Sequence, residues 1–220
     1  MPARSPTRCV SSAPPNTFPI RIAAELWYPS RVTRATSDTA DLAAARARLR
    51  EILLQRSIRF GDFTLSSGAK SRYYADVRQT SLDPEGALLI ARLLDPILAE
   101  HGVRAVGGLT LGADPIVGAL ITWTQIQGRG LSGFLVRKAE KTHGTARRIE
   151  GPFDKALPCA IVDDVITKGG SALQAFEAVR EAEGDVRVVA CVVDRNEGGG
   201  EEFASRGIPF RCIFTIQEFL

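Results

Sequence analysis

The sequence predicts an α/β protein in which a parallel β-sheet is covered by helices on both faces. Short apolar runs alternate with longer segments of helical periodicity through residues 103–214, as expected of strands joined by crossover helices. Glycines and charged residues follow several of the apolar runs directly, and ligands of such sheets bind beyond the carboxyl ends of the strands. At 220 residues, the chain accommodates one domain of this kind with extensions.

The first elements precede the main sheet. A helix is predicted over residues 41–56, capped by Asp41, and its apolar face consists of Leu42, Ala45, Leu49, Ile52 and Leu53. Alternating aromatic and polar residues with glycines predict a few short strands within 57–78, which would form a small β hood. Asp83 and Pro84 are typical of a helix start, and that helix is expected to extend to about His101.

The remainder alternates strands with helices. Strands are predicted at Val103–Gly107, Gly133–Val136, Cys159–Val162, Val186–Val193 and Phe210–Phe214. Helices are predicted over 113–127 and 171–183, with a polar loop at 137–151 and a short helical turn at 200–206. The residues expected at the carboxyl ends of the strands are Gly107 to Gly112, Arg137, Asp163, Asp164 and Arg195.

The most informative segment is residues 160–171, Ala-Ile-Val-Asp-Asp-Val-Ile-Thr-Lys-Gly-Gly-Ser. Its glycines allow a tight turn and a close approach of the backbone to a ligand. The amides of Lys168 to Ser171, at a helix N-terminus, would bind a phosphate. Asp163 and Asp164 would repel that phosphate but suit sugar hydroxyls or a Mg²⁺-chelated group. The segment therefore indicates a ribose 5-phosphate site, although a strand, turn and helix with two solvated acids is the alternative.

Composition narrows the class of protein. The net charge of +3 does not imply a general nucleic-acid surface, and no apolar run approaches the length of a membrane span. The four cysteines have no Cys-x-x-Cys spacing, which argues against a zinc site or thioredoxin-type chemistry. Cys159 and Cys191 are expected to be buried, and a reducing cytoplasm is the expected location.

Residues 1–40 differ in composition from the rest of the chain. They hold six of the 12 prolines and five arginines but only two acids, Glu25 and Asp38. We expect a disordered extension, because such a segment buries too little apolar surface to order itself. A wrongly chosen start codon and a weak targeting segment are the alternatives.

A second segment with a chemical pattern is residues 137–148, Arg-Lys-Ala-Glu-Lys-Thr-His-Gly-Thr-Ala-Arg-Arg. It carries five cationic side chains, one acid and His143, without hydrophobic periodicity. Considered alone, residues 137–148 are slightly more typical of a solvated surface loop than of a functional lid. One crossover before the segment at 160–171, it is better interpreted as a mobile cationic lid over a polyanion.

Together these segments resemble the type I phosphoribosyltransferases, and among them the orotate phosphoribosyltransferases. The twelve residues 160–171 resemble the phosphoribosyl-pyrophosphate (PRPP) motif, and the Arg-Lys-x-x-Lys-x-His loop is typical of the orotate enzymes. The resemblance covers about residues 41–214 and includes Phe63-Thr-Leu-Ser-Ser-Gly68, Lys70-Ser-x-Tyr-Tyr-x-Asp76, Gly107-Gly-Leu-Thr-Leu-Gly-Ala-Asp-Pro115 and Val193-Asp-Arg195.

The resemblance implies the fold, the reaction and the site. Residues 41–220 would form the phosphoribosyltransferase domain, with the hood and orotate-binding segment at 41–80 and the PRPP-binding core at 81–214. The enzyme would convert orotate and PRPP to orotidine 5′-monophosphate and pyrophosphate, with Mg²⁺ held mainly by substrate and water. A homodimer is implied, in which Arg137 reaches the site of the neighbouring subunit.

The resemblance also assigns roles by position. Asp163 and Asp164 would hold the ribose hydroxyls, and Lys138, Lys141 and His143 would bind the pyrophosphate. The expected catalytic residues are Lys141, His143, Asp163 and Asp164, and Thr167 and Arg195 would contact orotate. The 5-phosphate would lie among Val165, Ile166, Thr167, Lys168, Gly169, Gly170 and Ser171.

The sequence also departs from one branch of this family. That branch has a Lys where this chain has Ser66, and another near Ala113 and Asp114. The pyrophosphate contacts are therefore expected to depend more on the lid, and the orotate loop on its backbone amides. A phosphoribosyltransferase for a purine or another pyrimidine, and a non-enzymatic PRPP-sensing regulator of the same fold, are the alternative functions.

Overall fold

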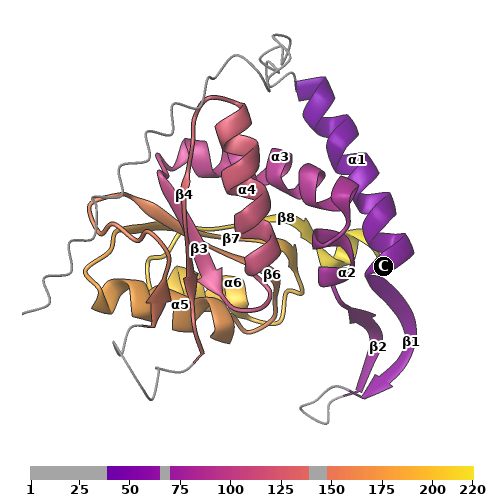
Figure 1. The fold of residues 1–220 in the computed structure, drawn as a ribbon. Helices are drawn as coiled ribbons and strands as arrows, with labels where there is room; N and C mark the ends of the chain where they lie inside the picture. The colour runs from indigo at the N-terminus through magenta and orange to yellow at the C-terminus, as the bar shows by residue number, and fades with distance from the viewer. Residues whose placement is uncertain (1–38, 65–69, 139–147) are drawn as a thin grey trace, which may run out of the picture. The chain divides into compact units, whose positions relative to one another are not determined.

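The computed structural model describes residues 39–64, 70–138 and 148–220 (Figure 1). Residues 1–38 of the predicted tail, Ser66 and most of the predicted lid, including Lys141 and His143, lie outside these residues. Along the described chain, none of the helices is both long and apolar enough to cross a membrane.

The centre of the fold is a six-stranded sheet of order β5-β4-β3-β6-β7-β8. These strands are β3 (Ala105–Leu109), β4 (Ser132–Val136), β5 (Ile149–Glu150), β6 (Cys159–Ile166), β7 (Val186–Asp194) and β8 (Phe210–Thr215). All neighbours are parallel except β5, which pairs antiparallel with β4. The carboxyl ends of β3, β6 and β7 are therefore neighbours along one edge of the sheet, which is where ligands of such sheets bind.

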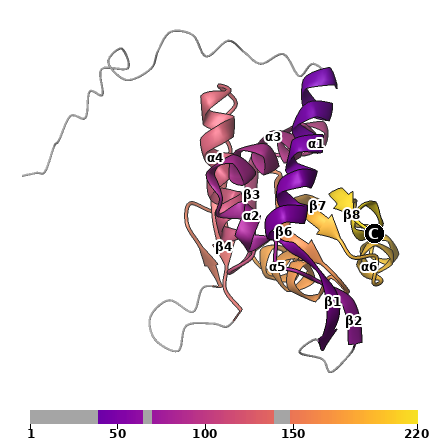
Figure 2. The ribbon, with the colours of Figure 1, turned by 90° about the vertical axis from the view of Figure 1, so that its right-hand side faces the viewer.

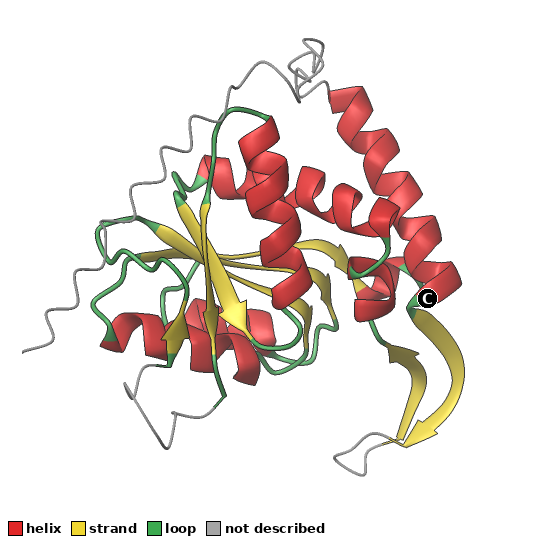
Figure 3. Ribbon diagram, in the orientation of Figure 1, coloured by secondary structure: helices red, strands yellow, loops and turns green. Residues whose placement is uncertain are grey.

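Helices cover both faces of this sheet, as the ribbon in Figure 3 shows. One apolar core lies between the sheet and α1 (Thr39–Arg56), α3 (Pro84–Glu100) and α4 (Asp114–Ile126). The other lies beneath α5 (Gly170–Glu181) and α6 (Gly199–Ser205), with Phe134, Phe176 and Phe203 among its members. The strands are apolar on both sides because both faces are buried. The chain ends in a short 3-10 helix, η1 (Ile216–Glu218).

The segment between α1 and α3 forms a separate hairpin. Strands β1 (Ile58–Thr64) and β2 (Lys70–Ala75) pair only with each other, antiparallel, and project away from the main sheet (Figure 2). The four-residue helix α2 (Arg78–Ser81) connects them to α3 and packs on α1, α3 and α4. The start of α3 is capped by Asp83, whose Oδ1 accepts hydrogen bonds from the amides of Glu85 and Gly86 at 3.1 and 3.0 Å.

Most predicted elements are confirmed, including the hood-like hairpin and the buried Cys159 and Cys191. Several details differ, including the strand predicted at Val103–Gly107, which lies at Ala105–Leu109. The strand predicted to end at Val162 continues to Ile166, the polar loop 137–151 ends in β5, and α2 and η1 were not predicted. Asp41 lies in the first turn of α1 rather than at its cap, where its charge still favours the helix dipole, and it pairs with Arg92.

Candidate active site

The carboxyl ends of the central strands border a cleft of about 320 Å³. Its lining residues come from β2 and α2, from the ends of β3 and β6 and the segments that follow them, from the start of α5, and from the segments after β4 and β7. They are Ala75, Asp76, Arg78, Leu109, Thr110, Leu111, Gly112, Lys138, Asp163, Asp164, Val165, Thr167, Ser171 and Arg195. Segments far apart in the sequence therefore meet at the edge where the sequence places the site.

The two adjacent carboxylates belong to β6 itself. Asp163 pairs with Cys191 of β7 and is only 5% exposed, and Asp164 is partly buried. Each accepts a hydrogen bond from the next backbone amide, Asp164 N at 3.0 Å and Val165 N at 2.8 Å. Burial, and then the neighbouring Asp164, raise the pKa of Asp163 well above its ordinary value, and burial raises that of Asp164. These carboxylates are costly to keep ionised without a hydrogen-bond donor or a cation.

A backbone loop lies against this pair. It contains a cis peptide bond between Thr110 and Leu111, and it continues into Gly112. A Cβ atom on Gly112 would lie 2.6 Å from Asp164 Oδ1 and 2.8 Å from Asp163 Oδ1. Only glycine therefore lets the loop approach the carboxylates this closely.

The turn between β6 and α5 has a geometry suited to an anion. Gly169 has a left-handed φ of 79°, and no side chain caps α5, so the first-turn amides remain available. The segment at the start of α6 supports the turn from behind, because Gly199 N donates to Thr167 O at 2.9 Å. A Cβ on Gly169 would lie 2.9 Å from the ring of Phe203.

Arg195 lies at another border of the cleft and is held on several sides. Its guanidinium stacks 4.8 Å above the Tyr73 ring, its Nε donates to the Tyr73 hydroxyl at 3.3 Å, and an amino group lies 2.7 Å from Glu197. Its side chain is only 9% exposed. The hairpin thus positions Arg195 through Tyr73, and a planar guanidinium in such a setting is suited to a carboxylate.

The structure brings most of the predicted site residues together. Lys138, Asp163, Asp164, Val165, Thr167, Ser171 and Arg195 line the cleft, and Lys168, Gly169 and Gly170 complete the turn. The side chain of Ile166 is buried in the core. Arg137 does not line the cleft, and its guanidinium lies 3.4 Å from Glu150 on β5. Lys141 and His143 lie outside the described residues.

Sequence reasoning missed two charged residues of this cleft, Asp76 and Arg78. Arg78 Nε donates to Asp76 Oδ1 at 2.8 Å, and this bond lowers the pKa of Asp76. The pattern Asp-Val-Arg directly after a strand, with a buried Val between two charges, was the available signal.

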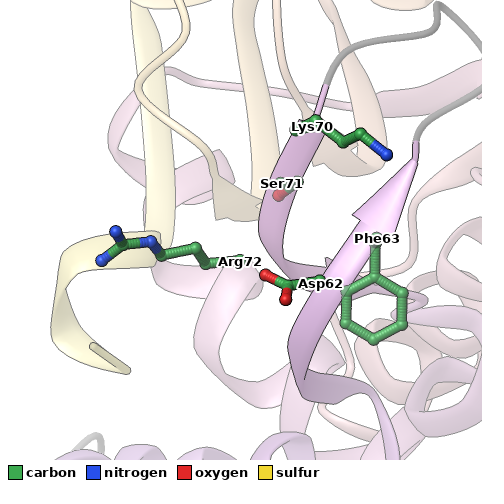
Figure 4. A pocket seen from close by; sticks show the side chains of 5 residues that line it. All are labelled: Asp62, Phe63, Lys70, Ser71 and Arg72. Carbon is green, nitrogen blue, oxygen red and sulfur yellow. The ribbon is translucent and has the colours of Figure 1, made fainter.

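A second hollow of about 410 Å³ lies in the hairpin (Figure 4). Asp62 and Phe63 of β1 and Lys70, Ser71 and Arg72 of β2 line it. It lacks the adjacent carboxylates and the uncapped helix start that the cleft at the sheet edge has. We therefore assign the chemistry to the cleft at the sheet edge.

Comparison with known proteins gives a consistent result. The chain is 44% identical over 182 residues to the orotate phosphoribosyltransferase of Bradyrhizobium sp. strain BTAi1, a match that covers 81% of this chain and 98% of that protein. It is also 44% identical over 192 residues to the orotate phosphoribosyltransferase of Rhodopirellula baltica. That match covers 84% of this chain and 97% of that protein. No family model matches the sequence.

Solved structures agree with these relatives. The Mycobacterium tuberculosis orotate phosphoribosyltransferase in complex with Fe(III) dicitrate superposes with a TM-score of 0.72 at 38% identity, over 79% of this chain and 98% of that one. The same enzyme in complex with PRPP gives a TM-score of 0.68 at 36% identity, and the match covers 79% of this chain and 98% of that one.

Proposed function

This chain belongs to the orotate phosphoribosyltransferase family, and from that premise we propose how its cleft transfers a phosphoribosyl group from PRPP to orotate. The observation that carries the proposal is the meeting of an uncapped helix start, two adjacent carboxylates and a held arginine in one cleft. The products would be orotidine 5′-monophosphate and pyrophosphate, a step of pyrimidine biosynthesis.

The sugar phosphate would lie along the end of β6. The first-turn amides of α5 and the hydroxyls of Thr167 and Ser171 suit the 5-phosphate, because they combine backbone donors with the positive end of the helix dipole. Asp163 and Asp164 would accept hydrogen bonds from the ribose hydroxyls. These hydroxyl donors would stabilise the ionised carboxylates that burial otherwise disfavours.

Negative charge develops on the departing pyrophosphate, and fixed cations would stabilise it there. Lys138 lines the cleft at the root of the predicted lid. We propose that Lys141 and His143 complete this cationic group when the lid closes, and that closure excludes the water that would hydrolyse the activated sugar.

The donor set fits Mg²⁺ bound mainly by substrate and water. Among the described residues, no group of three or more His, Cys, Asp or Glu side chains could hold a metal. Mg²⁺ favours few protein carboxylates together with phosphate oxygens and water, and Asp163 and Asp164 are available beside the sugar. Bound there, the ion would neutralise charge on the pyrophosphate.

Orotate would lie on the Arg195 side of the cleft. The guanidinium, stacked on Tyr73, would bind the orotate carboxylate through bidentate hydrogen bonds. Thr167 lines the same cleft and would also contact orotate. Orotate attacks C1 through a ring nitrogen, and the proton of that nitrogen passes to the departing pyrophosphate or to water as the new bond forms. We further propose a cytoplasmic homodimer in which Arg137 serves the neighbouring site.

The direct test mixes purified protein, PRPP, Mg²⁺ and orotate, and follows the loss of orotate absorbance. Parallel reactions with adenine, guanine, hypoxanthine and uracil test the alternative that another base is the acceptor. Orotate consumption that requires both PRPP and Mg²⁺ is the expected result. PRPP-dependent conversion of a different base, with orotate untouched, would overturn the proposal.

A further inference from the structure

Three cationic residues line the cleft within the described chain: Arg78, Lys138 and Arg195. Arg195 is held by Tyr73 and Glu197 and is assigned to orotate, and Lys138 stands at the root of the predicted lid. Arg78 has no role in the reaction as described so far. Its side chain is 46% exposed, so it can reach a ligand.

The guanidinium of Arg78 is held from one side only. Its Nε donates to Asp76 Oδ1 at 2.8 Å, which fixes the direction of the side chain. Within the described residues, its two terminal amino groups have no hydrogen-bond partner. The Asp164 charge lies near enough to raise the pKa of Arg78, after the larger effect of Asp76. Arg78 is thus a cation of fixed direction beside the carboxylates proposed to bind the sugar, and its terminal amino groups can still donate hydrogen bonds to a ligand.

The position of Arg78 indicates which part of the substrate it meets. Helix α2 packs with α1, α3 and α4 on one face of the sheet, whereas the phosphate-binding turn begins α5 on the other face. The carboxylates at the end of β6 lie between these two faces. A ribose with its 5-phosphate at the turn and its hydroxyls at the carboxylates directs its C1 end away from the turn, toward α2.

We propose that Arg78 binds the pyrophosphate of PRPP and stabilises the charge that develops on it during transfer. As the bond between C1 and the pyrophosphate oxygen breaks, its electron pair stays on the leaving group. A ring nitrogen of orotate forms the new bond to C1 and gives up its proton to the departing pyrophosphate or to water. The two terminal amino groups of Arg78 can donate a bidentate pair of hydrogen bonds to phosphate oxygens. This inference rests on the function proposed above.

The test compares Arg78→Gln and Arg78→Lys with wild type and with Arg187→Gln. Arg187 is a matched control, because its Nε donates to the residue two positions earlier, Asp185, at 2.7 Å, just as Arg78 does to Asp76. Arg187 lies near the start of β7, at the end of that strand opposite to the cleft. Steady-state rates would be measured against PRPP and orotate separately, together with inhibition by pyrophosphate and calorimetric binding of PRPP without orotate.

Arg78→Gln is expected to lower kcat/KM for PRPP by about 10²-fold, because loss of one charge-stabilising contact has an effect of that order. Inhibition by pyrophosphate and binding of PRPP should weaken, while KM for orotate stays near wild type. Arg78→Lys should recover part of the loss, since it keeps the charge but not the planar fork. Arg187→Gln should match wild type in all four measurements.

Three outcomes would overturn the assignment: PRPP kinetics of Arg78→Gln equal to wild type, an equal loss in Arg187→Gln, or an effect confined to KM for orotate. Melting temperatures of the variants show whether any loss reflects unfolding, and Arg78→Lys keeps the assignment testable if Arg78→Gln does not fold. Wild-type protein that fails to form orotidine 5′-monophosphate would instead contradict the proposed function. The two failures are therefore distinguishable.

Discussion

Substitutions of single side chains in the cleft are expected to change turnover without unfolding the protein. Replacing both Asp163 and Asp164 by Asn is expected to abolish turnover while the protein stays folded, because the amides no longer accept hydroxyl protons as carboxylates do. Turnover would be measured at saturating PRPP and orotate, with circular dichroism as the control for folding. A folded double variant with activity within about tenfold of wild type, roughly 1.4 kcal/mol in barrier, would contradict the ribose-binding assignment.

The same double variant is expected to melt at a higher temperature than wild type at neutral pH without ligand. Burial raises the folded-state pKa of both carboxyls, so the folded protein binds more protons than the unfolded chain between the ordinary and the raised values. Their contribution to stability is therefore greatest below the ordinary pKa and is lost as pH rises through the raised value. The advantage of the Asn variant should shrink as pH is lowered, which melting curves across pH would show.

At the residue level, the sequence predicted which side chains lie together where the pattern is local. Asp163, Asp164, Thr167 and Ser171 lie in one contiguous segment, and the structure places them together in the cleft. Arg78 was missed, because its place beside Asp164 depends on how the hairpin and α2 pack, which no local pattern encodes.

At the scale of one helix, the cap of α3 offers a test of stability independent of activity. Asp83→Ala removes the acceptor of two first-turn amides, and it also removes the partner of Arg56, whose amino group lies 2.9 Å from Asp83 Oδ2. A loss of about 1 kcal/mol of unfolding free energy is expected from the cap, or about 2–4 °C in melting temperature for a domain of this size. The kcat should be unchanged.

Asp83→Asn is the matched control for this helix. Its side-chain oxygen can still accept from Glu85 N and Gly86 N, so its melting temperature should lie near wild type. Equal destabilisation of the two variants would attribute the effect to the ion pair with Arg56 instead.

Element boundaries show where sequence reasoning reached its limit. Periodicity identified the strand at Cys159, but two adjacent acids were interpreted as its end, whereas β6 continues through them to Ile166. Pairing with β7 as far as Asp194 overrides the low strand preference of Asp, because the partner strand satisfies the backbone there. The short pieces α2 and β5 are four and two residues long, too short for a periodic signal.

At the scale of the chain, the composition of residues 1–38 predicts little contribution to the enzyme. Deleting them is expected to leave kcat and melting temperature nearly unchanged, since the segment holds six prolines and has no helical or strand periodicity that would form a core. Calorimetric melting of the two forms, with activity in the same buffer, measures this. A large drop in melting temperature would show that the segment packs against the domain.

The proposed sharing of sites between subunits can be tested by mixing two inactive variants. Suppose that Arg137→Ala is combined with the Asp163/Asp164 double Asn variant and subunits exchange. If Arg137 acts on the neighbouring subunit, each heterodimer contains one intact site and one site with both defects, so up to half of the heterodimer sites should work. Activity should therefore reappear on mixing.

The alternative gives the opposite result. If Arg137 acts in its own subunit, every site in the heterodimer keeps one defect, and mixing restores nothing. Native mass spectrometry of the mixture is the control for exchange. Verified exchange without recovery would exclude the shared site.

The order of strands in the sheet is a property of the whole molecule that the sequence did not provide. Alternation of strands and helices predicted a parallel sheet, and the structure confirms it. However, β3 neighbours β6 although β4 and β5 lie between them in the chain, and this arrangement creates the edge where Gly112 meets Asp163 and Asp164. Which strands become neighbours depends on the relative stability of many alternative packings of the whole chain, and no single segment determines it.

Under the proposed function, the buried carboxylate pair also links sugar binding to the proton concentration of the surroundings. Free protein retains a proton on this pair at pH values where an exposed aspartate would have lost it. Ribose hydroxyls favour the ionised pair, so occupancy of the cleft expels that proton into the buffer. In the pH range between the ordinary and raised pKa, affinity for the sugar phosphate should therefore rise with pH, and the heat of binding should vary with the ionisation enthalpy of the buffer.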